Sequence, residues 1–254
     1  MKTKETDMKL RHYFLAILLS LSSLINAQLK FSSQELEQIQ VKTTTENGIE
    51  HYFFELNGKK IGPSVSTTGY VIASFRNKKG QIENAHIKLK AEDIKIDLYK
   101  KGELDGKGFH FEIDQLIYAR DVDKEYISDY YATPFQEQQV TGRGCMGRCT
   151  DGFGFTNYKE DGIQVMGFFK NSYPEGPVYT EASHQNYYGN FKKGYREGFG
   201  MVMIKKNQRK DIFISSFKKG TPVGLSFFFN LSNNKIAANY RDKNGIVVKE
   251  FEVQ

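Results

Sequence analysis

The chain of 254 residues contains no tryptophan, five prolines and two cysteines, and each scarcity limits what the protein can be. Two cysteines exclude a small fold held together by several disulfides. The five histidines show no metal-ligand spacing such as His-x-x-x-His, and no Gly-x-Ser-x-Gly motif or phosphate-binding loop is present. We therefore expect no catalytic residues, no metal and no cofactor. An envelope hydrolase is the less favoured alternative, because no convergent set of polar residues can be assembled from the sequence.

Long apolar runs are also missing, apart from a short stretch at residues 13–24. This stretch follows the basic residues Lys9 and Arg11 and precedes a small-residue site at Ala27, which is the pattern of a signal peptide at residues 1–27. The alternative is an uncleaved N-terminal anchor. We expect export, with the protein periplasmic, associated with the outer membrane or secreted.

Charge of one sign is not in large excess. The formal net charge is +6, and residues 1–27 contribute four basic and two acidic groups, which leaves +4 for the remainder. An excess this mild does not indicate a nucleic-acid partner.

Glycine and aromatic residues, in contrast, recur with a fixed phase. Residues 191–200 (FKKGYREGFG) resemble residues 99–108 (YKKGELDGKG), and residues 169–176 and 217–224 keep the same spacing. A second glycine follows each turn, at intervals of one or two periods of about two dozen residues: Gly62, Gly106, Gly152, Gly176, Gly198 and Gly224. Asn84 stands where another second glycine would fall. Such a period indicates a repeat protein in which neighbouring units bury each other's faces.

Each unit has the composition of a β-hairpin, with short runs of Phe, Tyr, Ile and Val on both sides of a polar turn. Asn57-Gly58 and Asn244-Gly245 are the strongest turn signals, because both residue types accept positive φ. Gly198 and Gly200 leave room for an aromatic ring of the next hairpin to lie over bare backbone. We expect an all-β fold, an elongated twisted antiparallel sheet of consecutive hairpins held together by stacking between units.

These hairpins are expected to cover residues 50–254, about nine units in all. We divide the chain into a signal peptide (1–27), a polar lead-in (28–47), divergent repeats (48–141) and regular repeats with a C-terminal capping hairpin (142–254). Residues 33–37 have the composition of a short helix or of a capping strand. The pattern is lost near residues 110–141, which is either a degenerate repeat or an insertion.

Cys145 and Cys149 are four residues apart and flank one turn. In an oxidising compartment this favours a disulfide. A metal site is a weaker alternative, because no second cysteine pair or nearby histidine is present. A redox pair is weaker again, because the spacing is not Cys-x-x-Cys.

Residues 188–200 (YGNFKKGYREGFG) resemble the MORN repeat (membrane occupation and recognition nexus), with its pattern aromatic-x-Gly-x-aromatic-x-x-Gly-x-x-x-Gly-x-Gly. Residues 145–154 (CMGRCTDGFG) are similar to the cysteine-flanked unit of some exported bacterial members. The resemblance implies hairpins joined edge to edge in a long sheet, used for protein–protein contact or membrane association, and no catalytic residues. The positions that define the repeat are Tyr99, Gly102, Gly106, Gly152, Phe169, Gly176, Gly189, Phe191, Gly194, Gly198, Gly200, Phe217, Gly220 and Gly224.

Lysine pairs occur beside the turns in the same phase. Equal phase predicts equal location, so these lysines should line one long edge that attracts an anionic lipid surface or polysaccharide: Lys59, Lys60, Lys78, Lys79, Lys100, Lys101, Lys192, Lys193, Lys218 and Lys219. The alternative is that they only keep the turns soluble and resist edge pairing. Acidic neighbours such as Glu103, Asp105 and Glu197 would weaken the field.

The favoured function is a non-enzymatic scaffold that contacts a protein partner or the envelope surface. Rings such as Tyr187, Tyr188 and Phe168 would supply contact area if they are exposed. The alternative, favoured for most of these rings, is that they only cover their neighbouring hairpins. Peripheral binding of anionic lipid or polysaccharide through the lysines is the alternative.

Overall fold

The computed structural model describes residues 29–66, 71–90, 93–112, 115–121, 145–158, 162–206, 209–230, 233 and 235–253. The signal-peptide prediction for residues 1–27, and any repeat unit near residues 121–129, lie almost wholly outside these ranges. Where it is described, the chain is nearly all β, which confirms the predicted fold class.

In the described part of the chain, eighteen strands form two antiparallel sheets, and in each sheet the strands follow one another in chain order. The first sheet has eight strands: β1 (Gln40–Glu46), β2 (Ile49–Leu56), β3 (Lys59–Ser66), β4 (Val71–Arg76), β5 (Ile82–Lys90), β6 (Asp93–Lys100), β7 (Glu103–Glu112) and β8 (Gln115–Arg120). The second has ten: β9 (Cys145–Gly147), β10 (Asp151–Tyr158), β11 (Ile163–Lys170), β12 (Tyr173–Glu181), β13 (Gln185–Lys192), β14 (Tyr195–Lys206), β15 (Arg209–Lys218), β16 (Thr221–Asn230), β17 (Lys235–Arg241) and β18 (Val247–Phe251).

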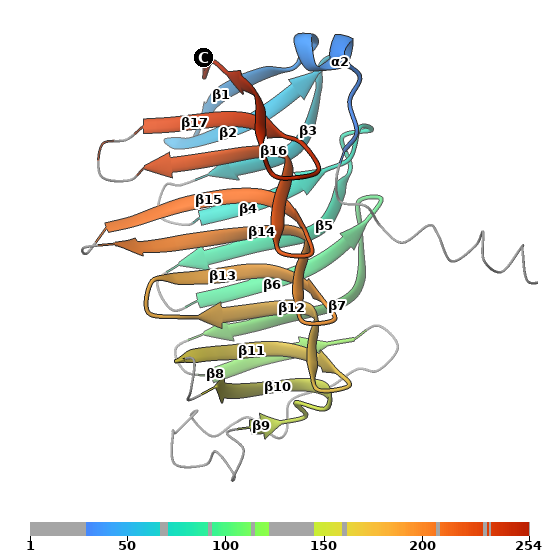
Figure 1. The fold of residues 1–254 in the computed structure, drawn as a ribbon, viewed down its shortest axis with the longest axis vertical. Helices are drawn as coiled ribbons and strands as arrows, with labels where there is room; N and C mark the ends of the chain where they lie inside the picture. Colours follow the sequence, from blue (N-terminus) through green and yellow to red (C-terminus); the bar gives the residue numbers. More distant parts are fainter. Residues whose placement is uncertain are drawn as a thin grey trace, which may run out of the picture.

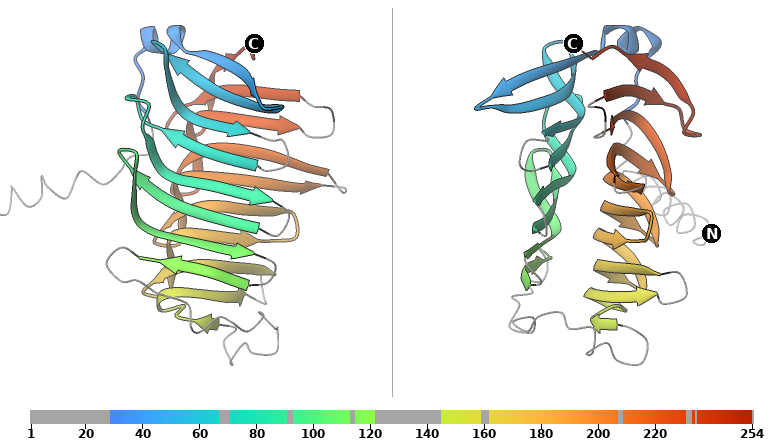
Figure 2. Two further views of the ribbon diagram at one scale, coloured as in Figure 1. Left: turned by 180° about the vertical axis from the view of Figure 1, so that it is seen from behind. Right: turned by 90° about the vertical axis from the view of Figure 1, so that its left-hand side faces the viewer.

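The two sheets lie face to face along the whole stack (Figures 1 and 2). The strand order of the second sheet runs in the opposite direction to that of the first. Therefore β3 packs against β16, β5 against β14 and β7 against β12. Units that are far apart in the sequence are therefore neighbours in space.

The main hydrophobic core lies between the sheets. Aromatic pairs cross the interface along its length, with ring centroids 4.4 Å apart for Phe54 and Phe227 and 5.5 Å apart for Phe109 and Phe153. The repeat pattern predicted that the stabilising contacts lie between consecutive hairpins of one sheet. For the main core this prediction was wrong, because the core lies between the two sheets. Alternation along each strand leaves two faces to every sheet, and burying one apolar face requires a second layer.

A short helix closes one end of the sandwich. Helix α2 (Ser33–Gln38) begins with a capping box in which Ser32 and Glu35 exchange hydrogen bonds. Lys249 Nζ of β18 donates to the Leu36 carbonyl at 2.9 Å, which ties the helix to the second sheet. Of the two alternatives for residues 33–37, the helix is observed, and β1 follows it within the segment expected to be a polar lead-in.

Candidate functional site

Tight turns with two residues at positive φ join the paired strands of most repeat units. Turns of this kind match the twist of the flanking strands. Five of them lie on one side of the sandwich and are centred on Asn57-Gly58, Lys101-Gly102, Asn171-Ser172, Lys193-Gly194 and Lys219-Gly220. A further turn of this kind, Asn47-Gly48, joins β1 to β2 on the opposite side. Asn57 and Gly58 have φ of 52° and 71°, which confirms the first of the two turn predictions.

The second turn prediction was right about the hairpin and wrong about its conformation. Gly245 has positive φ, whereas Asn244 does not. The turn closes with a hydrogen bond from Gly245 N to Asp242 O, and Asp242 Oδ1 accepts from the backbone N–H groups of Asn244 and Ile246. A side chain that satisfies the turn in this way favours a longer loop with a single left-handed glycine.

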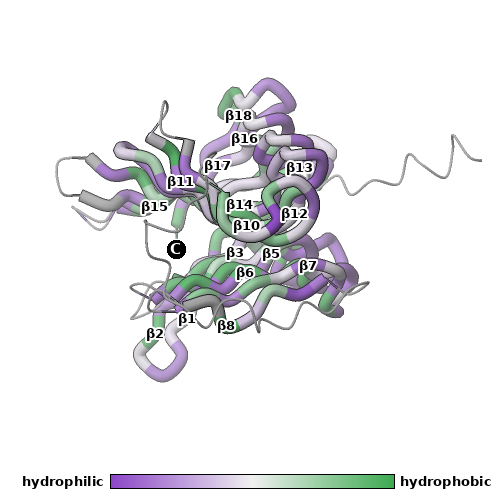
Figure 3. The backbone as a smooth tube through the Cα atoms, turned by 90° about the horizontal axis from the view of Figure 1, so that it is seen from below, coloured by the Kyte–Doolittle hydropathy of each residue, from purple (hydrophilic) through white to green (hydrophobic). Residues whose placement is uncertain are grey.

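The second glycine marks a bulge in the return strand at Gly62, Gly106, Gly176, Gly198 and Gly224, but not at Gly152. In the unit at 188–200, Gly189 lies opposite Gly200 while Phe191 lies opposite Arg196, so one residue of β13 faces three of β14. The extra residues centre on Gly198, whose φ is 77°. A bulge with a left-handed residue bends the strand, and in Figure 3 the hairpins of the second sheet curl at this end.

Consecutive hairpins are joined at their turns by a repeated pair of hydrogen bonds. The turn of one unit donates a backbone N–H to the carbonyl two residues before the bulge position of the previous unit: Gly102 to Ile82, Ser172 to Thr150, Gly194 to Pro174 and Gly220 to Arg196, at 2.8–3.0 Å. In three of these turns, the residue just before that donor also donates its backbone N–H, in this case to the carboxylate of a glutamate. The glutamate lies directly before the bulge position of the previous unit: Lys101 donates to Glu83, Lys193 to Glu175 and Lys219 to Glu197, at 2.7–3.1 Å. Glu197, expected only to weaken the basic field, therefore also fixes the next turn.

The ten predicted lysines lie in two columns on one side of the molecule, not along a single edge. Lys59, Lys60, Lys78, Lys79, Lys100 and Lys101 belong to the first sheet, and Lys192, Lys193, Lys218 and Lys219 to the second. Both columns face the same way because the bulges of the two sheets face each other: a Cβ added at Gly62 of β3 would lie 2.8 Å from Leu225 Cδ1 of β16. The two sheets stand opposite each other in Figure 2. We call this side the turn face.

Most of these lysines present their amines to solvent. All are exposed except the half-buried Lys192. Lys78 Nζ pairs with Glu35 at 2.6 Å, and Lys60 Nζ lies 4.2 Å from the centroid of the Phe53 ring. The other lysines of the two columns form no ion pair with any described residue.

The rings that reach solvent differ from those expected. Tyr187, Tyr188 and Phe168 are buried, so they do not form contact area and instead pack within the fold, as the alternative favoured for most of these rings predicted. Tyr173 and Tyr195, 60% and 59% exposed, each follow a tight turn of the second sheet. Their phase makes them part of the turn face.

A groove separates the two lysine columns. Its pocket of about 280 Å³ is lined by β5–β7 on one side and by β12–β14 on the other. The lining includes the carboxylates of Asp105, Glu175 and Glu197 and the amines of Lys107 and Lys192. No sequence pattern predicted this pairing, because the two walls of the groove come from units about ninety residues apart.

A second hydrophobic cluster fills the curl on the outer face of the second sheet. Three of the repeat-defining aromatics, Phe169, Phe191 and Phe217, pack there with Tyr187. The Tyr187 ring lies over Gly200, as the aromatic-over-glycine prediction required, but it comes from the adjacent strand of the same hairpin. The Arg196 guanidinium lies 4.6 Å from the centroid of this ring. Burial raises the pKa of Tyr187 and lowers that of Arg196.

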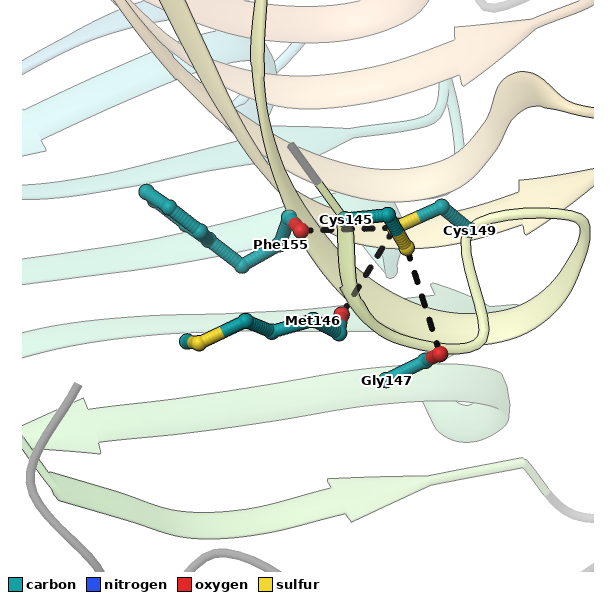
Figure 4. The surroundings of a disulfide bond; sticks show 5 residues. All are labelled: Cys145, Met146, Gly147, Cys149 and Phe155. Carbon is teal, nitrogen blue, oxygen red and sulfur yellow. Dashed lines mark hydrogen bonds between the residues drawn. A yellow bond between two sulfur atoms is a disulfide. The ribbon is translucent and has the colours of Figure 1, made fainter. Parts of the chain in front are cut away.

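Cys145 and Cys149 form the predicted disulfide, with Cα atoms 6.2 Å apart (Figure 4). It joins β9 to the turn that precedes β10, at the end of the second sheet opposite helix α2. Cys149 packs against the outer cluster and lies over Gly154, where a Cβ would come within 2.8 Å of Sγ. The disulfide thus stabilises the edge hairpin of the second sheet, β9–β10.

Reduction of this disulfide should lower the free energy of unfolding by about 2 kcal/mol at most, because the closed loop is short. Urea denaturation with and without reductant measures the effect. The double variant Cys145→Ser/Cys149→Ser should match the reduced protein. Complete unfolding on reduction would contradict the assignment of a local role.

A polar network that the sequence analysis missed covers the outer face of the first sheet. The buried Asp97 accepts hydrogen bonds from Tyr118 and from Arg120, whose Nη2 lies 2.8 Å from Oδ1. Ser74 Oγ lies 2.8 Å from His86 Nδ1, and burial lowers the pKa of His86. Buried carboxylates need such partners, so the arrangement satisfies the sheet's own polar groups.

Within the described ranges, no group of three or more His, Cys, Asp or Glu side chains is arranged to hold a metal ion. No helix of the described chain is long and apolar enough to cross a membrane. Neither a protein-family model nor a curated protein sequence matches the chain.

Proposed function

We propose that this protein is a non-enzymatic exported scaffold that presents its turn face to a partner protein. The proposal rests on one observation: Tyr173 and Tyr195 stand exposed on successive turns of a rigid sheet, among lysines that have no described ion-pair partner. Tyrosine supplies large contact area at small entropic cost and is enriched at interfaces. The hydrogen bonds between consecutive turns hold these side chains at a fixed spacing. The MORN-like pattern and the disulfide support the same interpretation.

The lysine columns favour a partner with an acidic surface. Seven exposed lysines of the two columns, Lys59, Lys79, Lys100, Lys101, Lys193, Lys218 and Lys219, make no ion pair with a described residue. Complementary charge raises the rate of association and selects the partner. The same lysines support the second candidate function, peripheral binding of anionic lipid or polysaccharide.

Two matched variants separate these functions. Lys218→Glu/Lys219→Glu reverses two charges on the turn face, and Lys90→Glu/Lys235→Glu reverses two at the opposite ends of the strands. If lipid is the target, the first variant should bind vesicles of anionic phosphatidylglycerol about tenfold more weakly or worse, because each lysine near such a surface contributes about 1 kcal/mol. The second variant should bind like the wild type. Co-sedimentation at low and high salt measures both, with neutral vesicles as the reference.

The protein-partner function predicts a different pattern. Tyr173→Ala/Tyr195→Ala should lose a stoichiometric envelope protein that the wild type retains in crosslinking, while its binding to anionic vesicles stays unchanged. Equal retention by wild type and the tyrosine variant would overturn the scaffold proposal. Equal sedimentation with neutral and anionic vesicles would overturn the lipid alternative.

A further inference from the structure

One unit departs from the repeat at a position that faces the groove. Among the described units whose bulge contains a residue at positive φ, that residue is glycine in the others, including Gly62, Gly106 and Gly198, but β5 has Asn84 there. Asn84 takes the same left-handed conformation, with φ of 63°. A side chain in this region costs free energy that glycine avoids, although asparagine tolerates it better than most residues.

The Asn84 side chain is buried without the hydrogen bonds that burial normally requires. The residue is 7% exposed, and its Nδ2 has no hydrogen-bond partner in the described chain. An unpaired buried donor destabilises a protein by about 1–3 kcal/mol. Strain and an unpaired donor at one position, in a repeat that supplies glycine elsewhere, indicate a ligand more than a role in folding.

The wall opposite Asn84 is also polar at this level. Asn190 of β13 lines the same pocket, whereas Phe54 and Phe168 stand in its phase in two other units and Ser216 in a third. The smaller polar side chain leaves more room in the groove than a phenylalanine would. Leu98, Tyr99 and Phe191 contribute to the lining as well.

The lining places donors beside acceptors. Asn84 Nδ2 is a donor, the carboxylates of Asp105 and Glu197 are acceptors, and the Asn190 amide is both. A hydroxyl group donates and accepts at once, so vicinal hydroxyls satisfy such a set. A free anion fits poorly, because the pocket's three carboxylates outnumber its two lysines. An apolar side chain would leave the amides and carboxylates unpaired.

We infer that this groove is a carbohydrate-binding site that holds a neutral sugar residue of a glycan, with Asn84 as the donor that selects it. The pocket of about 280 Å³ is at the small end of ligand sites and suits one or two sugar rings. The inference does not depend on the turn-face function, because it uses the groove and, of the two lysine columns, only the half-buried Lys192.

The test compares wild type with Asn84→Gly, the residue that the repeat itself prescribes. The probes are cellotetraose, chitotetraose (the N-acetylglucosamine tetramer) and trialanine, followed by isothermal titration and by amide chemical shifts. We expect one of the two glycans to bind the wild type and to shift groove residues. Asn84→Gly should bind it at least tenfold more weakly while its melting temperature is unchanged or higher.

Three results would overturn the inference: neither glycan binds the wild type, Asn84→Gly binds as tightly as wild type, or trialanine alone binds in the groove. Lys218→Glu/Lys219→Glu is the matched control and should bind the glycan like wild type. Loss of glycan binding in that variant would mean that the glycan binds the lysine columns, and it would also contradict the proposed site in the groove.

Discussion

Replacing Phe54 by alanine should lower the free energy of unfolding by about 3–5 kcal/mol, as for other fully buried phenylalanines. Its side chain is completely buried between the sheets, against Phe227 and Phe251. The expected loss combines the transfer of the ring to water with the cavity that remains. Guanidinium denaturation followed by far-UV circular dichroism measures it, with Tyr173→Ala, an exposed ring, expected to stay within about 0.5 kcal/mol of wild type.

The Phe54 variant also tests how the two sheets depend on each other. Phe227→Ala should cost a similar amount, and the double variant should cost less than the sum, because the two rings are in contact. Both sheets should unfold in one transition. If only the hairpins next to Phe54 were to melt and the second sheet remained folded, contacts along each sheet would outweigh the core between the sheets.

Gly200→Ala should destabilise the protein by about 3 kcal/mol through overpacking. A Cβ at this position would lie against Tyr187 Oη and 2.6 Å from Cζ of the same ring. Tyr187 is fully buried and donates to the Asn190 carbonyl at 3.1 Å, so the ring has no free space into which it can move. The midpoint of urea denaturation measures the loss.

Gly220→Asn is the matched control for the Gly200 variant. Its Cβ would meet nothing within 4 Å, and asparagine tolerates the φ of 85°. We expect a change of less than about 1 kcal/mol. Tyr187→Phe should partly relieve Gly200→Ala, because it removes the hydroxyl that the new methyl group meets. A Gly200 variant as stable as the Gly220 control would show that the ring does not depend on bare backbone.

Local chemistry made part of this structure predictable. The turn at Asn57-Gly58, the hairpin at Asn244-Gly245 and the disulfide between Cys145 and Cys149 all depend on residues close together in the sequence. The bulge phase belongs to the same class, since Asn84 adopts the positive φ of the glycines it replaces. Backbone sterics and short-range geometry decide such features, and both can be inferred from residue types and spacing.

Which aromatic rings are exposed could not be predicted in this way. Tyr187 and Tyr195 are both tyrosines of one hairpin, yet the first is buried and the second is among the most exposed large side chains. The curl that covers Tyr187 results from the bulges of several hairpins acting together. Sequence alternation predicts the two faces of a strand but not which face another layer covers.

By itself, then, the amino-acid sequence determined the hairpins, their turns, the glycine phase and the disulfide, because each is set within one repeat. The tertiary structure alone decided that the array doubles back as two sheets, so that Phe54 meets Phe227 and Asn84 faces Asn190. A repeat period of about two dozen residues predicts how a unit pairs with the next unit in the sequence. It does not predict which distant unit packs against it in the other sheet. The core, the two lysine columns and the groove all arise from that long-range pairing, which the burial of apolar strand faces imposes.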